Sequence, residues 1–112
     1  MTPAQALTIW HKTALAQVHA DAPDLTMRQM AILLTVYLNP PPHTVRALAE
    51  HLGVTKPVIT RALDTMGQMK LVDRRRDERD RRNVLIQRTV QGSEYLERFA
   101  RLVSSQTEDA VL

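Results

Sequence analysis

The sequence predicts a mainly α-helical protein that carries one small β-hairpin. Apolar residues recur at helical spacing in several segments, and 44% of the 112 residues are hydrophobic but only 4% aromatic, which favours an aliphatic, helical core. Two short helical segments flank Gly53, as in a helix-turn-helix pair. Downstream, the charged run 77–82 separates the apolar segments 71–72 and 84–86, which is typical of a hairpin with a charged tip. A helix-turn-helix followed by such a hairpin is a winged helix-turn-helix, an α+β fold.

The first two helices are expected over residues 3–20 and from Thr26 to about Leu38. In the first helix, apolar side chains recur every three or four residues. The second begins with a capping-box pattern, in which Thr26 and Gln29 satisfy each other's free N–H groups. Because its sequence is apolar nearly all round, we expect it to be the central buried helix, ended by the prolines that follow Asn39.

Two shorter helices and a final one complete the expected α-helical content. Thr44 and Thr55 can cap the two short helices, and Gly53 supplies the left-handed residue of the turn between them. Thr89 can cap the final helix, over residues 89–108. The outward-facing residues of the second short helix are Lys56, Pro57, Thr60, Arg61 and Asp64.

Positive charge is concentrated around the hairpin. The formal net charge is +3, but residues 70–88 hold eight basic and four acidic side chains, whereas the rest of the chain holds seven and eight. A local basic patch is the footprint expected of a nucleic-acid-binding surface. The concentration of charge by itself is equally consistent with a solvent-exposed loop. The preceding helix-turn-helix pattern favours the interpretation as a DNA-binding surface.

Composition also indicates the cellular compartment in which we expect the protein. The chain has no cysteine, so disulfides and thiolate chemistry are excluded, which fits a reducing environment. No segment approaches the ~18 apolar residues of a membrane span, and no secretory signal is visible. We therefore expect a soluble, cytoplasmic protein of one domain over residues 1–112, with a DNA-binding core at about 25–92 and flanking helices at 3–20 and 89–108 that dimerise.

The second short helix has the side chains that a recognition helix needs. Such a helix enters the major groove with its N-terminal residues near the base edges. Arg61 can form two hydrogen bonds to guanine, and Thr60 can donate or accept. Lys56 suits a phosphate, and Pro57 or Val58 can touch a thymine methyl group.

In the hairpin, the arginines and Asp80 are expected to have different roles. Arginine donates in a planar fork that suits phosphate or a narrow minor groove. We expect Asp80 to pair with a neighbouring arginine and hold the tip in shape, and one tip arginine to bond the wing to the helices. The expected DNA-binding residues are Thr55, Lys56, Pro57, Val58, Thr60, Arg61, Arg74, Arg75, Arg76, Arg79, Arg81 and Arg82.

These motifs resemble the MarR family of bacterial winged-helix transcriptional regulators. The most family-specific piece is the wing motif Asp-x-Arg-Asp-Arg-Arg over residues 77–82. The resemblance extends from Leu25 to about Gly92. Its other segments are Leu25-Thr26-x-x-Gln29, the helix-turn-helix over residues 45–61, Leu71-Val72-x-Arg74 and Thr89-x-x-Gly92.

The resemblance implies a homodimer that binds a palindromic operator, usually as a repressor released by a small-molecule effector. It also implies that the helix beginning at Thr55 is the recognition helix. The arginine at the place of Arg81 would enter the minor groove, and the aspartate at the place of Asp80 would orient an arginine. No cofactor is implied.

Three features depart from the family pattern. Lys70 stands where the family has glycine, and because a left-handed backbone would strain a lysine, the preceding helix is expected to end differently. Arg88 stands where the family prefers an apolar residue. The family's terminal helices are usually longer, and we expect the last helix here to stop near Leu112 without a further C-terminal helix.

The expected dimer surface is formed by apolar residues of the first and last helices. These side chains are too apolar to stay exposed on a monomer of this size. They are Leu7, Trp10 and Leu15 of the first helix, and Tyr95, Leu96, Phe99 and Leu102 of the last.

Nothing in the sequence indicates an active site. There is no glycine-rich phosphate loop, nucleophile elbow or carboxylate pair on an apolar frame, so we do not expect an enzyme. The four histidines lack partners at ligand spacing, so no metal site is expected. The alternative to a DNA-binding regulator is a protein-interaction module, a winged helix that binds or titrates another regulator.

Overall fold

The computed structural model describes the backbone of residues 1–111 and the side chains of residues 1–107. The chain divides into a winged unit, Leu25–Ser93, and a terminal unit, Met1–Asp24 with Glu94–Leu112. The predicted fold class, mainly α-helical with one β-hairpin, is confirmed. Among the described residues, no helix combines the length and apolar character that a membrane crossing needs.

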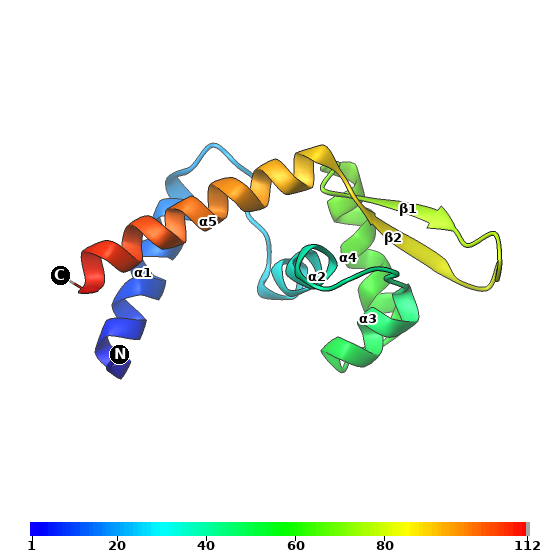
Figure 1. Ribbon diagram of the computed structural model, residues 1–112, viewed down its shortest axis with the longest axis horizontal. Helices are drawn as coiled ribbons and strands as arrows, with labels where there is room; N and C mark the ends of the chain where they lie inside the picture. The colour runs from blue at the N-terminus through cyan, green and yellow to red at the C-terminus, as the bar shows by residue number, and fades with distance from the viewer. Residues whose placement is uncertain (112) are drawn as a thin grey trace. The chain divides into compact units, whose positions relative to one another are not determined.

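Helix α2 (Met27–Leu38) is central to the winged unit, as predicted, but it is buried along one side only, and its end residues Met27 and Leu38 are 71% and 75% exposed (Figure 1). It begins with the expected capping box: the Thr26 hydroxyl accepts from the Gln29 N–H at 3.1 Å, and the Gln29 side chain accepts from the Thr26 N–H at 2.9 Å. Ile32, Leu33 and Val36 are fully buried along one side of the helix. Burial of three such side chains favours folding by roughly 5–9 kcal/mol before conformational entropy is counted.

Helices α3 (Val45–Leu52) and α4 (Lys56–Gln68) form the helix-turn-helix. Thr44 caps α3, and Gly53 has the left-handed backbone predicted for the turn, with φ of 68°. Thr55 stands at the start of α4, but its side chain makes no capping hydrogen bond, which differs from the prediction. One physical reason is that Pro57, in the first turn, has no N–H for such a cap to bind.

The end of α4 corrects the expectation about Lys70. The residue adopts the left-handed conformation, with φ of 61°, although it is not glycine. The Leu71 N–H donates to the Met66 carbonyl and the Lys70 N–H to the Gly67 carbonyl, both at 3.0 Å, which is the bond pair of a Schellman motif. The Thr89 hydroxyl also donates to the Lys70 carbonyl at 2.7 Å. These contacts outweigh the strain of a left-handed lysine.

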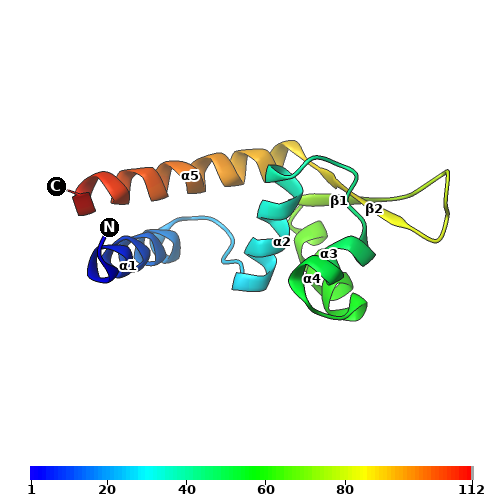
Figure 2. The same ribbon diagram turned by 60° about the horizontal axis from the view of Figure 1, so that its bottom comes forward.

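Strands β1 (Val72–Arg76) and β2 (Val84–Arg88) form the wing as an antiparallel pair, with Val72 opposite Arg88 and Arg76 opposite Val84. Val72 and Ile86 are buried and anchor the base of the hairpin. The Ile86 N–H donates to the His43 carbonyl at 2.8 Å, so β2 is also bonded to the segment before α3. Figure 2 shows the hairpin projecting beyond α2, α3 and α4.

Helix α5 (Val90–Val111) starts in a crowded junction. Thr89 caps it by accepting from the Gly92 N–H, as predicted. The Tyr37 hydroxyl accepts from the Thr89 N–H at 2.9 Å and lies within 3.1 Å of the carbonyl oxygens of Leu71 and Thr89. A Cβ atom at Gly92 would collide with that hydroxyl and with the Leu71 carbonyl oxygen, so this position requires glycine. The helix extends beyond the predicted end at residue 108.

The terminal unit contains α1 (Pro3–His19) and the greater part of α5. Tyr95 is only 3% exposed, and its hydroxyl joins two parts of the unit. It accepts from the Gln17 side chain and donates to the Pro23 carbonyl, both at 2.9 Å. This phenol therefore ties the chain after α1 to α5 within the unit.

Replacing Lys70 with glycine tests the account of the α4 terminus. Lys70→Gly should raise the free energy of unfolding by roughly 0.5–1 kcal/mol, because relief of the left-handed backbone exceeds glycine's greater entropy loss on folding. Lys70→Ala is the matched control, since it keeps the Cβ atom and should give no gain. Urea unfolding of the three proteins measures the difference, and an equal gain in both variants would assign the effect to the lysine side chain.

Candidate nucleic-acid interface

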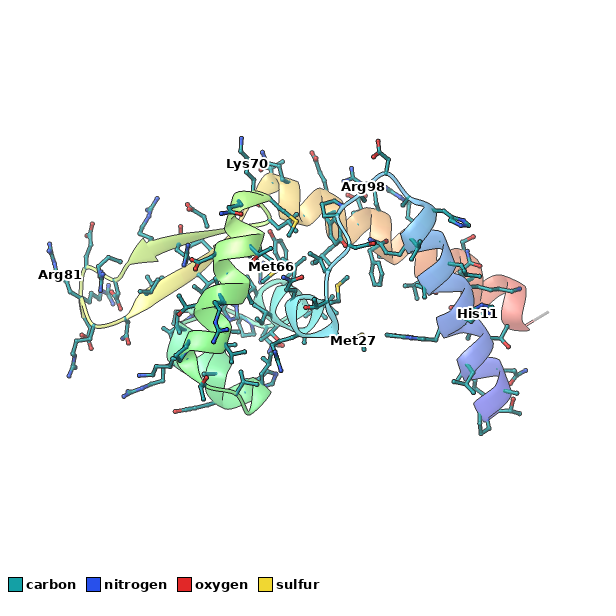
Figure 3. All side chains as sticks on the ribbon, turned by 180° about the vertical axis from the view of Figure 1, so that it is seen from behind. His11, Met27, Met66, Lys70, Arg81 and Arg98 are labelled. Carbon is teal, nitrogen blue, oxygen red and sulfur yellow. The ribbon has the colours of Figure 1, made fainter. Side chains whose placement is uncertain are left out.

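Helix α4 has one buried face and one free face. Ile59, Leu63 and Met66 are fully buried, and Figure 3 shows Met66 between α4 and α2. On the opposite side, the sequence-predicted DNA contacts are exposed except for Val58, which is half-buried; the exposed ones are Thr55, Lys56, Pro57, Thr60 and Arg61. The free face of α4 is therefore open to a large partner.

The tip of the wing is held by its own short-range hydrogen bonds. Asp77 accepts from the Arg79 N–H at 2.9 Å, and the Arg76 guanidinium donates to the Arg81 carbonyl at 2.7 Å across the hairpin. The Asn83 N–H donates to the Asp80 carbonyl at 3.0 Å. In Figure 3, Arg81 lies at the far end of the hairpin, well away from the helices of the winged unit.

Asp80 and Arg82 form a two-point ion pair within the wing. The Arg82 Nε and Nη2 atoms donate to the two carboxylate oxygens of Asp80, both at 2.9 Å, and the Arg82 N–H donates at 3.2 Å. These bonds from Arg82, with a smaller contribution from the charge of Arg46, hold the pKa of Asp80 below its ordinary value against the opposing effect of desolvation. Asp80 is therefore ionised at neutral pH and engaged by Arg82.

Arg74 connects the wing to α4 through its guanidinium. Its Nη1 atom lies 2.8 Å from Asp64 Oδ1, in an exposed salt bridge between β1 and the outward side of α4. Exposed pairs of this kind contribute at most about 1 kcal/mol, so the pair adds a contact between the wing and α4 but little stability. The sequence predicted that a tip arginine would make this link, but it is made by Arg74, at the base of the hairpin. Arg75 is exposed and pairs across the strands with Leu85.

A hollow of about 470 Å³ lies between α3, the start of α4 and the wing. Three cationic residues line it, namely Arg46, Lys56 and Arg82, and its acidic lining residue is Asp80, already paired with Arg82. Sequence reasoning assigned no role to Arg46. The available signal was a basic residue in the first turn of the helix that precedes the recognition helix.

Arg88, the second departure from the family pattern, stabilises the end of α2. It donates from Nε to the Val36 carbonyl at 3.0 Å and from Nη2 to the Asn39 carbonyl at 3.1 Å. Its guanidinium also lies 5.7 Å from the centre of the Tyr37 ring. Since the last turn of α2 contains no basic residue, Arg88 supplies the positive charge that a helix C-terminus favours.

The residues predicted to form a dimer surface differ in how much area they expose. Leu7, Trp10 and Leu15 on α1 are 70%, 59% and 46% exposed. On α5, Tyr95 is buried and bonded inside its own chain, whereas the other predicted residues are half-buried, namely Leu96, Phe99 and Leu102. Among the described residues, no group of three potential ligand side chains could hold a metal ion.

Comparison with known proteins places this winged helix-turn-helix in a family. A profile described as the MarR family matches residues 24–83, which is more than half of the 112 residues. The chain belongs to the MarR family. A search of curated proteins finds no significant match.

Solved structures share the fold at low sequence identity. A mutant of S. aureus MepR bound to an oligodeoxyribonucleotide is 24% identical, with a TM-score of 0.80 over 95% of this chain and 75% of that one. The regulator Tm0710 from Thermotoga maritima is 21% identical, with a TM-score of 0.68 over 95% and 69% of the two chains. PcaV from Streptomyces coelicolor, in complex with its natural ligand, is 22% identical, with a TM-score of 0.68 over 94% and 72%.

Titration of Asp80 tests the ion pair at the wing. Because the folded-state pKa is lowered, the pair should be complete at neutral pH and lost only as the pH falls through that lowered pKa, below the ordinary 3.8. Arg82→Gln should raise the pKa of Asp80 toward its ordinary value, whereas the matched variant Arg81→Gln should leave it unchanged. The ¹³C shift of the Asp80 carboxyl against pH measures this, and an ordinary pKa in the unmodified protein would contradict the assignment.

Proposed function

We propose that this protein is a sequence-specific DNA-binding transcriptional regulator that acts as a repressor. In this proposal α4 enters the major groove and the arginine wing reaches the adjacent minor groove. The observation that carries the proposal is the cationic hollow between α4 and the wing, because it joins two exposed elements into one surface. Membership of the MarR family supports the same function. The proposal includes no enzymatic activity.

The exposed face of α4 offers the chemistry of base recognition. Arg61 can donate two hydrogen bonds to guanine, and Thr60 can donate to or accept from a base edge. Lys56, at the start of the helix and beside the hollow, can contact a phosphate. Pro57 and Val58 provide apolar contact for a thymine methyl group.

The wing arginines have separate roles in the proposal. Arg74 is engaged by Asp64 and fixes the direction of the wing, while Arg82 is engaged by Asp80. Arg81, at the tip, is proposed to enter the minor groove, where the negative potential of a narrow groove attracts arginine. Arg79 is exposed two residues earlier in the chain, and Arg75 and Arg76 are proposed to lie near the DNA backbone.

A homodimer would place two such surfaces on a palindromic site. The exposed apolar residues of α1, Leu7, Trp10 and Leu15, are proposed to pair with a second copy together with Leu96, Phe99 and Leu102 of α5. We leave Tyr95 out because it is buried in its own chain. PcaV is solved in complex with its natural ligand, which supports a proposal that this regulator also binds a small molecule. Release from DNA by that molecule and a cytoplasmic location are further parts of the proposal.

Selection of bound duplexes from random DNA, with the purified protein, tests this function. The protein should enrich an inverted repeat whose half-sites are about one helical turn apart, at 10–10.5 base pairs. Arg61→Ala should weaken binding to the selected duplex by about tenfold and relax the preference at one base position per half-site.

Two outcomes would count against the proposal. If no sequence is enriched over random duplex, the protein is not a sequence-specific regulator and the protein-interaction alternative gains support. If selected and scrambled duplexes lose equal affinity in Arg61→Ala, Arg61 does not read a base.

A further inference from the structure

Helix α4 has a second hollow along its other flank. It measures about 250 Å³ and is formed by the start of α2 and the middle of α4. Residues four apart on a helix share one side, so Lys56 and Thr60 border the first hollow, whereas Val58 and Ala62 border the second. The exposed ridge of α4 therefore runs between two depressions.

Each hollow contains an arginine to which the proposed function has not assigned a contact. Arg46 of α3 lines the first hollow, and Arg28 of α2 lines the second beside Arg61. Both are exposed, and no salt bridge among the described side chains involves either of them. The lining of the second hollow contains no carboxylate, and the carboxylate in the first is paired with Arg82. Both guanidinium groups are thus available to an anion.

The dimensions of DNA indicate which anion fits this arrangement. The major groove is about 12 Å wide, and a helix with its side chains is about 10–12 Å across. A helix that fills the groove has one sugar-phosphate backbone along each flank. The two hollows lie along the two flanks of α4, where those backbones would pass.

We propose that Arg28 and Arg46 are phosphate contacts on opposite DNA strands, each seating the backbone that borders the major groove beside α4. This inference rests on the proposed function and adds two binding residues outside both the recognition helix and the wing. Guanidinium suits the task because its planar fork can donate two parallel hydrogen bonds to one phosphate. These contacts would fix the register of α4 without reading sequence themselves.

The pairing of Asp80 with Arg82 is compatible with a phosphate in the first hollow. An unpaired carboxylate there would repel the DNA backbone. Because Arg82 engages both carboxylate oxygens, the guanidinium of Arg46 remains available in the same hollow. The Asp80–Arg82 pair therefore shapes the hollow while limiting its negative charge.

Salt dependence of binding tests the proposal with Arg28→Gln, Arg46→Gln and the double variant. Because a bound dimer carries two copies of each arginine, each single variant should lower the magnitude of the slope of log affinity against log salt by about 1.8, the contribution of two phosphate contacts, and the double variant by about twice that. Selected and random duplexes should lose affinity equally. Lys12→Gln on α1 removes one exposed charge from the terminal unit and should leave the slope unchanged.

A second measurement locates the phosphates on the duplex. Single methylphosphonate linkages, which remove one backbone charge at a time, are placed along each strand of the selected duplex. In each half-site, the unmodified protein should lose affinity at one cluster on each strand. Arg28→Gln should become insensitive to one cluster, and Arg46→Gln to the other.

The results separate this inference from the proposed function. If the unmodified protein binds no duplex, the proposed function itself fails. If the protein binds its selected duplex and both variants keep the full salt slope, or both become insensitive to the same cluster, the assignment of Arg28 and Arg46 is overturned while the proposed function stands.

Discussion

The direction of the wing is set by the way the hairpin is attached to the helices. A two-stranded hairpin is marginally stable by itself in water, so its direction must be fixed by what it packs against. Buried Val72 and Ile86, the hydrogen bond from Ile86 to His43 and the Asp64–Arg74 pair provide that support. Because these contacts bind the wing to the segment before α3 and to α4, α4 and the wing form one surface.

Two carboxylates beside the hollow and the wing are held in ion pairs with arginine. Asp64 and Asp80 are each engaged by an arginine, and both pairs leave other cations exposed nearby. Such exposed pairs add little to the free energy of unfolding. Their value lies in geometry, because Arg74 directs the wing while the Arg82 pair shapes the tip.

Several features with local causes were predicted from the sequence, although the side-chain cap expected at Thr55 is absent, whereas features that depend on distant contacts were not predicted. The capping box at Thr26 and the left-handed Gly53 follow from short motifs, and both are confirmed. Lys70 was expected to avoid a left-handed backbone, and the expectation was wrong because the Thr89 hydroxyl, distant in sequence, helps to hold it there. The contacts of Arg88 with the end of α2 likewise join residues that no spacing pattern connects. The candidate site shows the same difference. The exposed face of α4 was predicted from the sequence pattern of the helix, whereas the position of Arg46 beside the wing was not predicted.

Dimethyl sulfate footprinting of the complex with a selected duplex tests whether α4 and the wing contact DNA together. The reagent methylates guanine at N7 in the major groove and adenine at N3 in the minor groove, so one experiment reports on both grooves. The account predicts protection of guanines opposite α4 and of adenines about half a helical turn, or about 5 base pairs, away, opposite the wing. Protection in one groove alone, or in neither groove despite tight binding, would contradict a surface that reads both.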